Sequence, residues 1–289
     1  MKNTLFTGVC TALVTPFLGD NVNYPMLEQL LRRQLDAGIR AIVLCGTTGE
    51  ASTLTDAEKL EIFKRAKSFV GSDCLIIAGT GSNNTTHALH LSMEAQKCGA
   101  DGLLLVSPYY NKANPEGLIR HYSTISQAVE LPMILYNVPS RTGLDMPVSV
   151  YAELRKLPNI AGVKEASADI TKITKIRHAC GADFAIWCGN DDQITPVIAL
   201  GGMGVISVLS NVCPLETRML TEAALDGDFD TAADLQTVLQ PLIEALFSDV
   251  NPIPVKAAMR HVGFDCGECR LPLGTMEDGK LRRLKSLLT

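Results

Sequence analysis

Eight short apolar segments, alternating with stretches of helical pattern, constrain the fold of this chain more than any other feature. Each is four to six residues long, and most carry Val, Ile or Leu at successive positions, which is typical of strands buried on both faces of a parallel sheet. Successive segments lie 19 to 34 residues apart, close to the roughly 30 residues of a β-α-β unit. We therefore predict strands at 9–14, 41–45, 75–78, 102–106, 133–136, 160–164, 184–188 and 204–208.

Helix-start signals stand between the predicted strands. Thr55 is followed three residues later by Glu58, the pattern of a capping box, in which each side chain accepts from the other residue's backbone N–H. Pro115 and Pro147 each follow a predicted strand, and a proline in the first turn of a helix loses no hydrogen bond. Helices are therefore expected to begin close to these residues.

Eight strand-then-helix units predict an α/β protein with a (β/α)8 TIM barrel and a C-terminal helical extension. We expect the barrel in residues 1–227 and the helical domain in 228–289. A doubly wound open sheet is the competing fold, but the G-x-G-x-x-G pattern of its dinucleotide-binding members is absent. In the extension we expect one helix, perturbed by Pro241, with an apolar stripe of Leu235, Val238, Leu239, Leu242 and Leu246.

Composition excludes several classes of protein. Hydrophobic residues make up 46% and charged residues 20% of the 289, unlike the composition of a disordered chain. The net charge of −5 leaves no basic footprint for nucleic acid, and no apolar run approaches the roughly 18 residues of a membrane span. We therefore expect no nucleic-acid or membrane partner. The nine cysteines are scattered through apolar segments, which indicates a reduced, cytoplasmic protein.

Metal sites find little support in the sequence. Cys266 and Cys269 form a lone C-x-x-C pair, whereas a structural zinc ion needs four ligands. The five histidines form no H-E-x-x-H motif, which argues against a metal-dependent hydrolase. We expect no metal.

The polar residues at the strand ends are the candidates for chemistry, because TIM barrels build their active sites from the loops that follow the strands. Lys164 ends the sixth segment, and strict alternation puts it on one face with Ile160 and Gly162. We place that face toward the barrel interior, with Gly162 leaving room for the lysine. Burial disfavours the charged form of a lysine, and Schiff-base chemistry needs the neutral amine. The alternative is a salt-bridged lysine at the mouth of the strand.

Other strand-end residues each have a functional and a plainer interpretation. Thr47 and Thr48, in Gly-Thr-Thr-Gly-Glu, offer hydroxyl and amide groups to an anion, or form the turn before a helix. Tyr136 is a candidate proton shuttle or a packing residue. Arg141 is suited to two parallel hydrogen bonds to a carboxylate, or is a solvated loop arginine. Tyr110 is explained most simply as a core or interface aromatic residue.

Seven short motifs follow one another along the chain: G-V-C-T-A-L-V-T-P-F, G-T-T-G-E, S-P-Y-Y-N-K, Y-N-V-P-S-R-T-G, G-V-K-E-A-S, G-V-I-S-V and N-P-I-P-V-K. Together they resemble the family of pyruvate-dependent class I aldolases that contains dihydrodipicolinate synthase and N-acetylneuraminate lyase. The resemblance covers nearly the whole chain. It implies no cofactor and a homo-oligomer, by analogy a homotetramer.

The resemblance also implies the catalytic roles. Lys164 matches the lysine that condenses with the ketone of pyruvate. Tyr136 matches the residue that donates and accepts protons, helped by Thr47 and Tyr110 in a hydroxyl relay. In the family, the second tyrosine reaches in from a neighbouring subunit. The implied enzyme is a Schiff-base-forming lyase.

Substrate binding is implied in the same way. Thr48 matches the residue that holds the carboxylate of pyruvate, and the backbone around Ile206 closes the other side. Gly189 belongs to the same substrate-binding end of the barrel. Arg141 matches the arginine that holds the carboxylate of aspartate 4-semialdehyde. The implied product is 4-hydroxy-tetrahydrodipicolinate, on the route to diaminopimelate and lysine.

Two residues favour the synthase branch of the family over the lyase branch. N-acetylneuraminate lyase lacks the arginine that stands here at Arg141, and it usually has Ser where this chain has Thr47. The alternatives are another pyruvate-dependent aldolase or lyase, such as a keto-deoxy sugar acid aldolase, and a catalytically silent barrel that binds a keto acid.

One group of positions departs from the family pattern. In relatives inhibited by lysine, the effector pocket uses a Ser, two His and a Glu, and the matching residues here are Ala51, Asp56, Lys59 and His87. The missing Glu is the expected partner of the effector's ammonium group, and Lys59 would repel it. We therefore predict weak or absent feedback inhibition by lysine.

Overall fold

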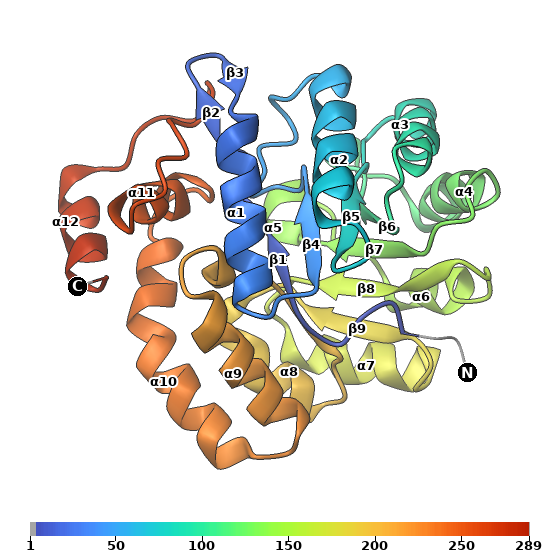
Figure 1. Cartoon of the computed structure of the whole chain (residues 1–289). Coiled ribbons are helices and arrows are strands. Elements are labelled where there is room, and N and C mark those ends of the chain that lie inside the picture. The colour runs from blue at the N-terminus through green and yellow to red at the C-terminus, as the bar shows by residue number, and fades with distance from the viewer. Residues whose placement is uncertain (1–3, 289) are drawn as a thin grey trace.

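The computed structural model describes residues 4–288, and its centre is a closed barrel of eight parallel strands. The strands are β1 (Gly8–Ala12), β4 (Ala41–Leu44), β5 (Leu75–Gly79), β6 (Gly102–Val106), β7 (Met133–Asn137), β8 (Ile160–Glu165), β9 (Ala185–Cys188) and β10 (Gly204–Ser207). Each pairs with its neighbours in the chain, and β1 closes the ring between β10 and β4. The prediction of a TIM barrel is confirmed, with each strand within a residue or two of its expected bounds (Figure 1).

Helices surround the barrel and cover its outer face (Figure 1). They are α1 (Tyr24–Asp36), α2 (Asp56–Val70), α3 (Thr85–Lys97), α4 (Pro115–Ser126), α5 (Pro139–Thr142), α6 (Val148–Leu154), α7 (Ile170–Cys180), α8 (Ile194–Ala199) and α9 (Pro214–Leu225), with short 3-10 turns at Asp191–Gln193 and Leu209–Asn211. The capping box of Thr55 and Glu58 is confirmed at the start of α2. Pro115 is the first residue of α4, but Pro147 precedes α6 as its N-cap.

The buried apolar residues form two clusters, one inside the barrel and one between the barrel and the helices. The inner cluster is small and includes Tyr136, Trp187 and Ile206, while the outer cluster joins the strands to the helices. Because side chains alternate along a strand, successive strand residues belong to different clusters. This alternation decides which residues can reach a site at the barrel mouth.

The alternation fails at one point in β8. The register with β7 shifts between Met133 and Ile134, so Ile160 packs in the outer cluster instead of sharing the face of Lys164. A bulge of this kind adds one residue to a strand and reverses the facing of what precedes it. Gly162 has a different role from the one expected, because a Cβ there would lie 2.1 Å from the backbone oxygen of Ala185. The glycine therefore permits the close approach of β9.

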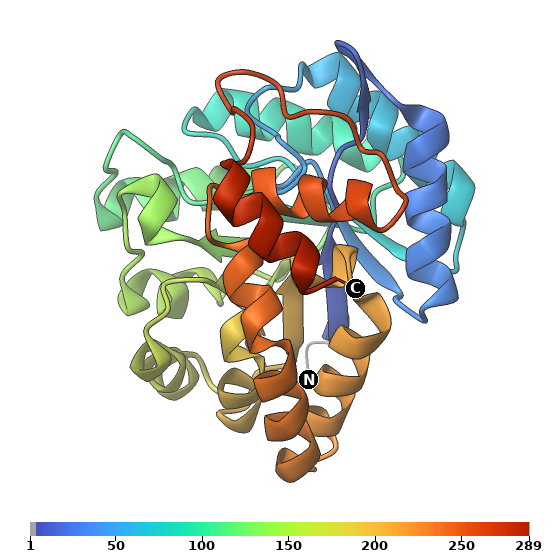
Figure 2. The same ribbon diagram turned by 90° about the vertical axis from the view of Figure 1, so that its left-hand side faces the viewer.

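The C-terminal residues form three helices, α10 (Phe229–Leu246), α11 (Ile253–His261) and α12 (Asp278–Ser286). The expected stripe on α10 is only partly correct, since Leu239, Leu242 and Leu246 are buried but Val238 is 75% exposed. In Figure 2, α11 and α12 lie across the front and the segment between them arches toward the hairpin of β2 (Phe17–Leu18) and β3 (Asn21–Val22). Across the described residues, no helix has the length and apolarity needed to cross a membrane.

Candidate active site

A cavity of about 510 Å³ opens at the carboxyl ends of the barrel strands. Its walls come from the loops after β4, β5, β6 and β7 and from two parts of the C-terminal region. Among the residues predicted for the site, Thr47, Tyr136 and Arg141 line it together, and Asn251 faces them from the C-terminal side. This is the end of the barrel at which the strand-end residues were expected to meet.

Lys164 lies beside Tyr136, which lines the cavity, but is not itself among the lining residues. The two residues are register partners on β8 and β7, and the Nζ atom of Lys164 is 4.4 Å from the centroid of the Tyr136 ring. Both are buried, with 5% and 7% of their surfaces exposed. On its other side Lys164 pairs in register with Trp187, a member of the inner cluster. The prediction that Lys164 faces the barrel interior is confirmed.

Ion pairing separates Lys164 from the other buried lysines. Within residues 4–288, Lys59, Lys172 and Lys256 are also buried, and each has a carboxylate oxygen within 4.0 Å. Lys164 has no carboxylate within that distance in the same part of the chain. A salt bridge holds a lysine in its charged form, whereas the nucleophile of Schiff-base chemistry is the neutral amine. Of the four, Lys164 therefore has the surroundings that suit a nucleophile.

The Gly-Thr-Thr-Gly-Glu loop is fixed by a buried ion pair that the sequence did not reveal. Glu50 ends this loop with a φ of 55°, and its carboxylate accepts from the Nζ atom of Lys256 on α11 at 2.7 Å. The other oxygen of Glu50 accepts from the backbone N–H of Arg270 at 2.9 Å. Both side chains of the ion pair are almost fully buried. The loop that carries Thr47 and Thr48 is thus anchored to residues more than 200 positions away.

Asn251 connects the two groups that were predicted to bind carboxylates. Its side-chain amide donates to the Oγ1 atom of Thr48 at 3.0 Å, and its backbone oxygen accepts from the guanidinium of Arg141 at 3.2 Å. The Asn251 Oδ1 atom is buried and has no hydrogen-bond partner among the described residues. The sequence showed Asn251 only as part of N-P-I-P-V-K, because its partners lie in distant loops.

The other five predicted residues are outside the cavity lining: Lys164, Thr48, Tyr110, Ile206 and Gly189. Tyr110 is 89% exposed, with a φ of 71°, so its ring projects from the surface of the single chain. Ile206 is fully buried in the inner cluster, to which Tyr136 also belongs. Gly189 lies at the end of β9, where a Cβ would approach that of Ala166 to 2.6 Å. Close packing of β8 and β9 therefore accounts for a glycine at this position.

The rim of the cavity carries the residues predicted to replace an effector site. Asp56 accepts from His87 at 2.8 Å and lies 3.6 Å from the ammonium of Lys59. The carboxylate of Asp56 is therefore already paired with two side chains.

The nine cysteines are all free thiols. No cluster of three or more metal-binding side chains occurs within residues 4–288.

Comparison with known proteins identifies the family. The model of the dihydrodipicolinate synthetase family matches residues 5–289. The chain belongs to this family. It is 48% identical over 286 residues to the 4-hydroxy-tetrahydrodipicolinate synthase of Thermoanaerobacter sp. (strain X514), which covers 99% of this chain and 96% of that protein. The resemblance inferred from the seven motifs is confirmed.

Solved structures of family members agree with the fold. The dihydrodipicolinate synthase of Aquifex aeolicus superimposes with a TM-score of 0.97 at 40% identity, covering 98% of this chain and 97% of that one. The enzyme from Cyanidioschyzon merolae, solved with lysine bound, gives a TM-score of 0.96 at 40% identity and covers 99% and 98%. Both chains match this one over almost their whole length.

Proposed function

We propose that this chain is a 4-hydroxy-tetrahydrodipicolinate synthase, which condenses pyruvate with aspartate 4-semialdehyde in lysine biosynthesis. The observation that carries the proposal is a buried lysine, Lys164, which lies beside Tyr136 at the barrel mouth and has no ion-pair partner among residues 4–288. The family membership and the names of close relatives give it independent support.

The first half of the reaction uses the amine and the phenol. The Nζ atom of Lys164 adds to the ketone carbon of pyruvate, the ketone oxygen leaves as water, and an iminium ion forms. The iminium withdraws electrons from the neighbouring methyl group, which loses a proton to give an enamine. We assign the proton transfers of these steps to Tyr136, helped by Thr47, which lines the same cavity.

The second half forms the new bonds. The enamine carbon attacks the aldehyde carbon of aspartate 4-semialdehyde, and the aldehyde oxygen takes a proton. The amino group of that substrate then displaces the Lys164 amine, which closes the ring and frees the enzyme. We assign the pyruvate carboxylate to Thr48 and the backbone around Ile206 and Gly189, and the second carboxylate to the guanidinium of Arg141.

We further propose that the active form is a homo-oligomer, a homotetramer by family resemblance. A tyrosine as exposed as Tyr110 leaves a large apolar ring in water, which is a feature of association surfaces. In the proposed assembly it completes the hydroxyl relay of a neighbouring subunit. We place the enzyme in the cytoplasm, because nine free thiols suit a reducing compartment.

We also propose residues 1–227 as the catalytic barrel and 228–289 as a C-terminal helical domain. Asp228 supports this boundary, since its side chain caps the first turn of α10 through the N–H of Thr231. The strands all end before this point. The helical domain nevertheless supplies Asn251 and Lys256 to the walls and supports of the cavity.

A substrate comparison tests the proposed function. Pyruvate with aspartate 4-semialdehyde is expected to give rapid condensation, while N-acetylneuraminate and keto-deoxy sugar acids are expected to be cleaved poorly. Faster cleavage of a sugar acid would move the chain to another branch of the family. Absence of turnover with every substrate would favour a barrel that only binds a keto acid.

A further inference from the structure

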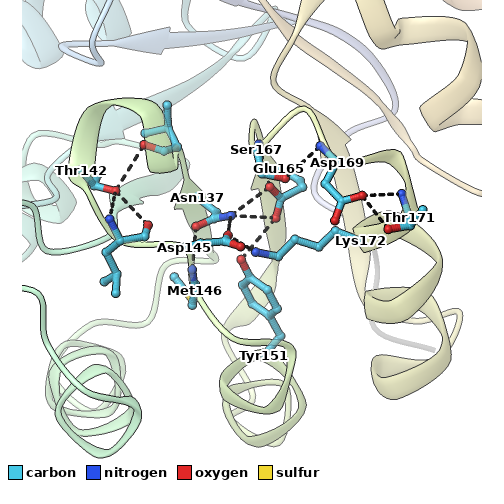
Figure 3. A network of polar contacts seen from close by, with 12 residues as sticks. Asn137, Thr142, Asp145, Met146, Tyr151, Glu165, Ser167, Asp169, Thr171 and Lys172 are labelled. Carbon is cyan, nitrogen blue, oxygen red and sulfur yellow. Dashed lines mark hydrogen bonds and ion pairs between the residues drawn. The ribbon is translucent and has the colours of Figure 1, made fainter.

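Two buried polar residues lie directly behind the proposed catalytic pair. Asn137 follows Tyr136 on β7, Glu165 follows Lys164 on β8, and these two are register partners, as are the two residues before them. Because side chains alternate, Asn137 and Glu165 face the layer under the helices while Tyr136 and Lys164 face the interior. Figure 3 shows both at the centre of a polar network.

The carboxylate of Glu165 is surrounded by hydrogen-bond donors. Its Oε1 atom accepts from the Asn137 amide and from the backbone N–H of Ser167, each at 2.9 Å. Its Oε2 atom accepts from the same amide at 3.2 Å and from the hydroxyl of Tyr151 at 3.3 Å. Four hydrogen bonds from three donor groups, with no acceptor among them, suit an ionised carboxylate, because a protonated one would turn a donor toward a donor.

The same network binds four elements together. The Oδ1 atom of Asn137 accepts from the backbone N–H of Met146 at 3.0 Å, and its amide also donates to Asp145 at 2.9 Å. Asp145 in turn pairs with Lys172 on α7. Tyr151 approaches from α6 (Figure 3). The ends of β7 and β8 are therefore joined to each other and to the helices outside them.

We propose that Glu165 is a positioning residue that fixes the separation and orientation of Lys164 and Tyr136. This inference rests on the proposed function. A strand residue cannot shift without moving its neighbours, so a carboxylate held by Asn137, Tyr151 and Ser167 holds the backbone that carries the lysine. Reactions of this kind are sensitive to such placement, and a displacement of about 1 Å can cost about 100-fold in rate.

The exchange E165Q tests the proposal because it changes the charge and one acceptor without changing the shape. The amide would direct two N–H groups at donors, and the strand ends would lose their fixed register. E153Q is the matched control, since Glu153 lies on α6 as an exposed residue paired only with Lys156 in the described chain. Y151F is a milder second variant that removes one of the three donor groups.

Two measurements are made on each folded variant: kcat and KM for the condensation, and the rate at which pyruvate with borohydride traps an adduct. For E165Q we expect kcat and the trapping rate to fall by about 10- to 100-fold, with the KM for pyruvate changed less than about threefold. Y151F is expected to lose roughly threefold in both rates. E153Q is expected to match the unmodified enzyme in both rates.

Different results overturn different claims. If the unmodified enzyme forms no adduct with pyruvate, the proposed function fails. If it forms one and folded E165Q traps pyruvate at the same rate, the proposed function stands and the role of Glu165 fails. If E165Q does not fold, unchanged rates in Y151F overturn that role instead. Melting curves correct each rate for the folded fraction, so a loss that only follows unfolding also counts against it.

Discussion

Two sides of one cavity are supported in different ways. Behind Lys164 and Tyr136, the support comes from the next residue on each strand, and the Asn137–Glu165 pair spans 28 positions of the chain. On the side of Thr48, the support comes from the C-terminal region, where Asn251 and Lys256 reach back by 203 and 206 positions. The proposed nucleophile is therefore held by the barrel itself, and the predicted anion-binding loop is held by the extension.

The difference explains why the C-terminal region belongs to the site. The barrel mouth alone would leave the Gly-Thr-Thr-Gly-Glu loop without its buried counter-ion and without the amide that holds Thr48. Damage to the barrel support is expected to slow chemistry. Damage to the extension is expected to lower stability or weaken binding of pyruvate. The predictions that follow separate these two kinds of effect.

The largest effect on stability is expected from replacing Lys256, whose ammonium group pairs with the buried carboxylate of Glu50. In K256M the carboxylate of Glu50 stays buried without its ion pair, which typically costs about 3–5 kcal/mol of unfolding free energy. Urea denaturation measures the loss. The double variant E50Q/K256M is expected to recover part of it, because no charge then remains buried. Equal stability of K256M and the unmodified enzyme would contradict a supporting role for the pair.

A second ion pair on the extension side, between Arg270 and Glu58, is expected to make the stability of the fold depend on pH. The Arg270 guanidinium holds the pKa of Glu58 down from its ordinary 4.5 to about 2, with further hydrogen bonds from Thr55. The unfolded chain therefore binds more protons than the folded chain between these pH values, and stability falls as pH falls through that window.

Removing the Arg270–Glu58 ion pair tests the pH dependence. R270M is expected to lose about 1.5–3 kcal/mol near pH 7, because hydrogen bonds to a charged partner are lost. Between about pH 4.5 and pH 2, the unfolding free energy of R270M is expected to fall less than that of the unmodified enzyme. Unfolding curves at several pH values give both quantities. Equal losses of unfolding free energy in the two proteins over this pH range would show that the contact with Arg270 does not set the pKa of Glu58.

A smaller and more selective effect is expected from N251A. The variant loses the amide that donates to Thr48 but keeps the backbone oxygen that accepts from Arg141. One hydrogen bond of this kind is worth about 1 kcal/mol, so the KM for pyruvate should rise roughly fivefold with kcat nearly unchanged. V250A, at the exposed preceding residue, is the control. A loss confined to kcat would place Asn251 with the barrel support instead.

The smallest effect is expected at the rim. Lysine at millimolar concentration should leave the rate of condensation unchanged, because Asp56 is already paired with His87 and Lys59 occupies the rim beside it. Initial rates with and without lysine measure this. Clear inhibition would show that the rim binds lysine by another set of contacts.

The sequence revealed the barrel side of the site better than the extension side. Alternation along a strand placed Lys164 in the interior, since this depends only on local geometry. It failed for Ile160, because a bulge depends on the partner strand. Asn137 and Glu165 were visible as polar strand ends, but their mutual contact required the register. Glu50 and Lys256 were visible only as the last residues of two motifs, and nothing local indicated their contact, because an ion pair across 206 positions is created only by folding.

The central claim is that pyruvate forms a covalent bond with Lys164 and with no other buried lysine. Borohydride reduction in the presence of pyruvate, followed by peptide mapping, compares Lys164 directly with Lys59, Lys172 and Lys256, which share its burial but have carboxylate partners. We predict a single reduced adduct on Lys164, absent from K164M together with turnover. An adduct on one of the paired lysines, or full turnover in K164M, would contradict the account.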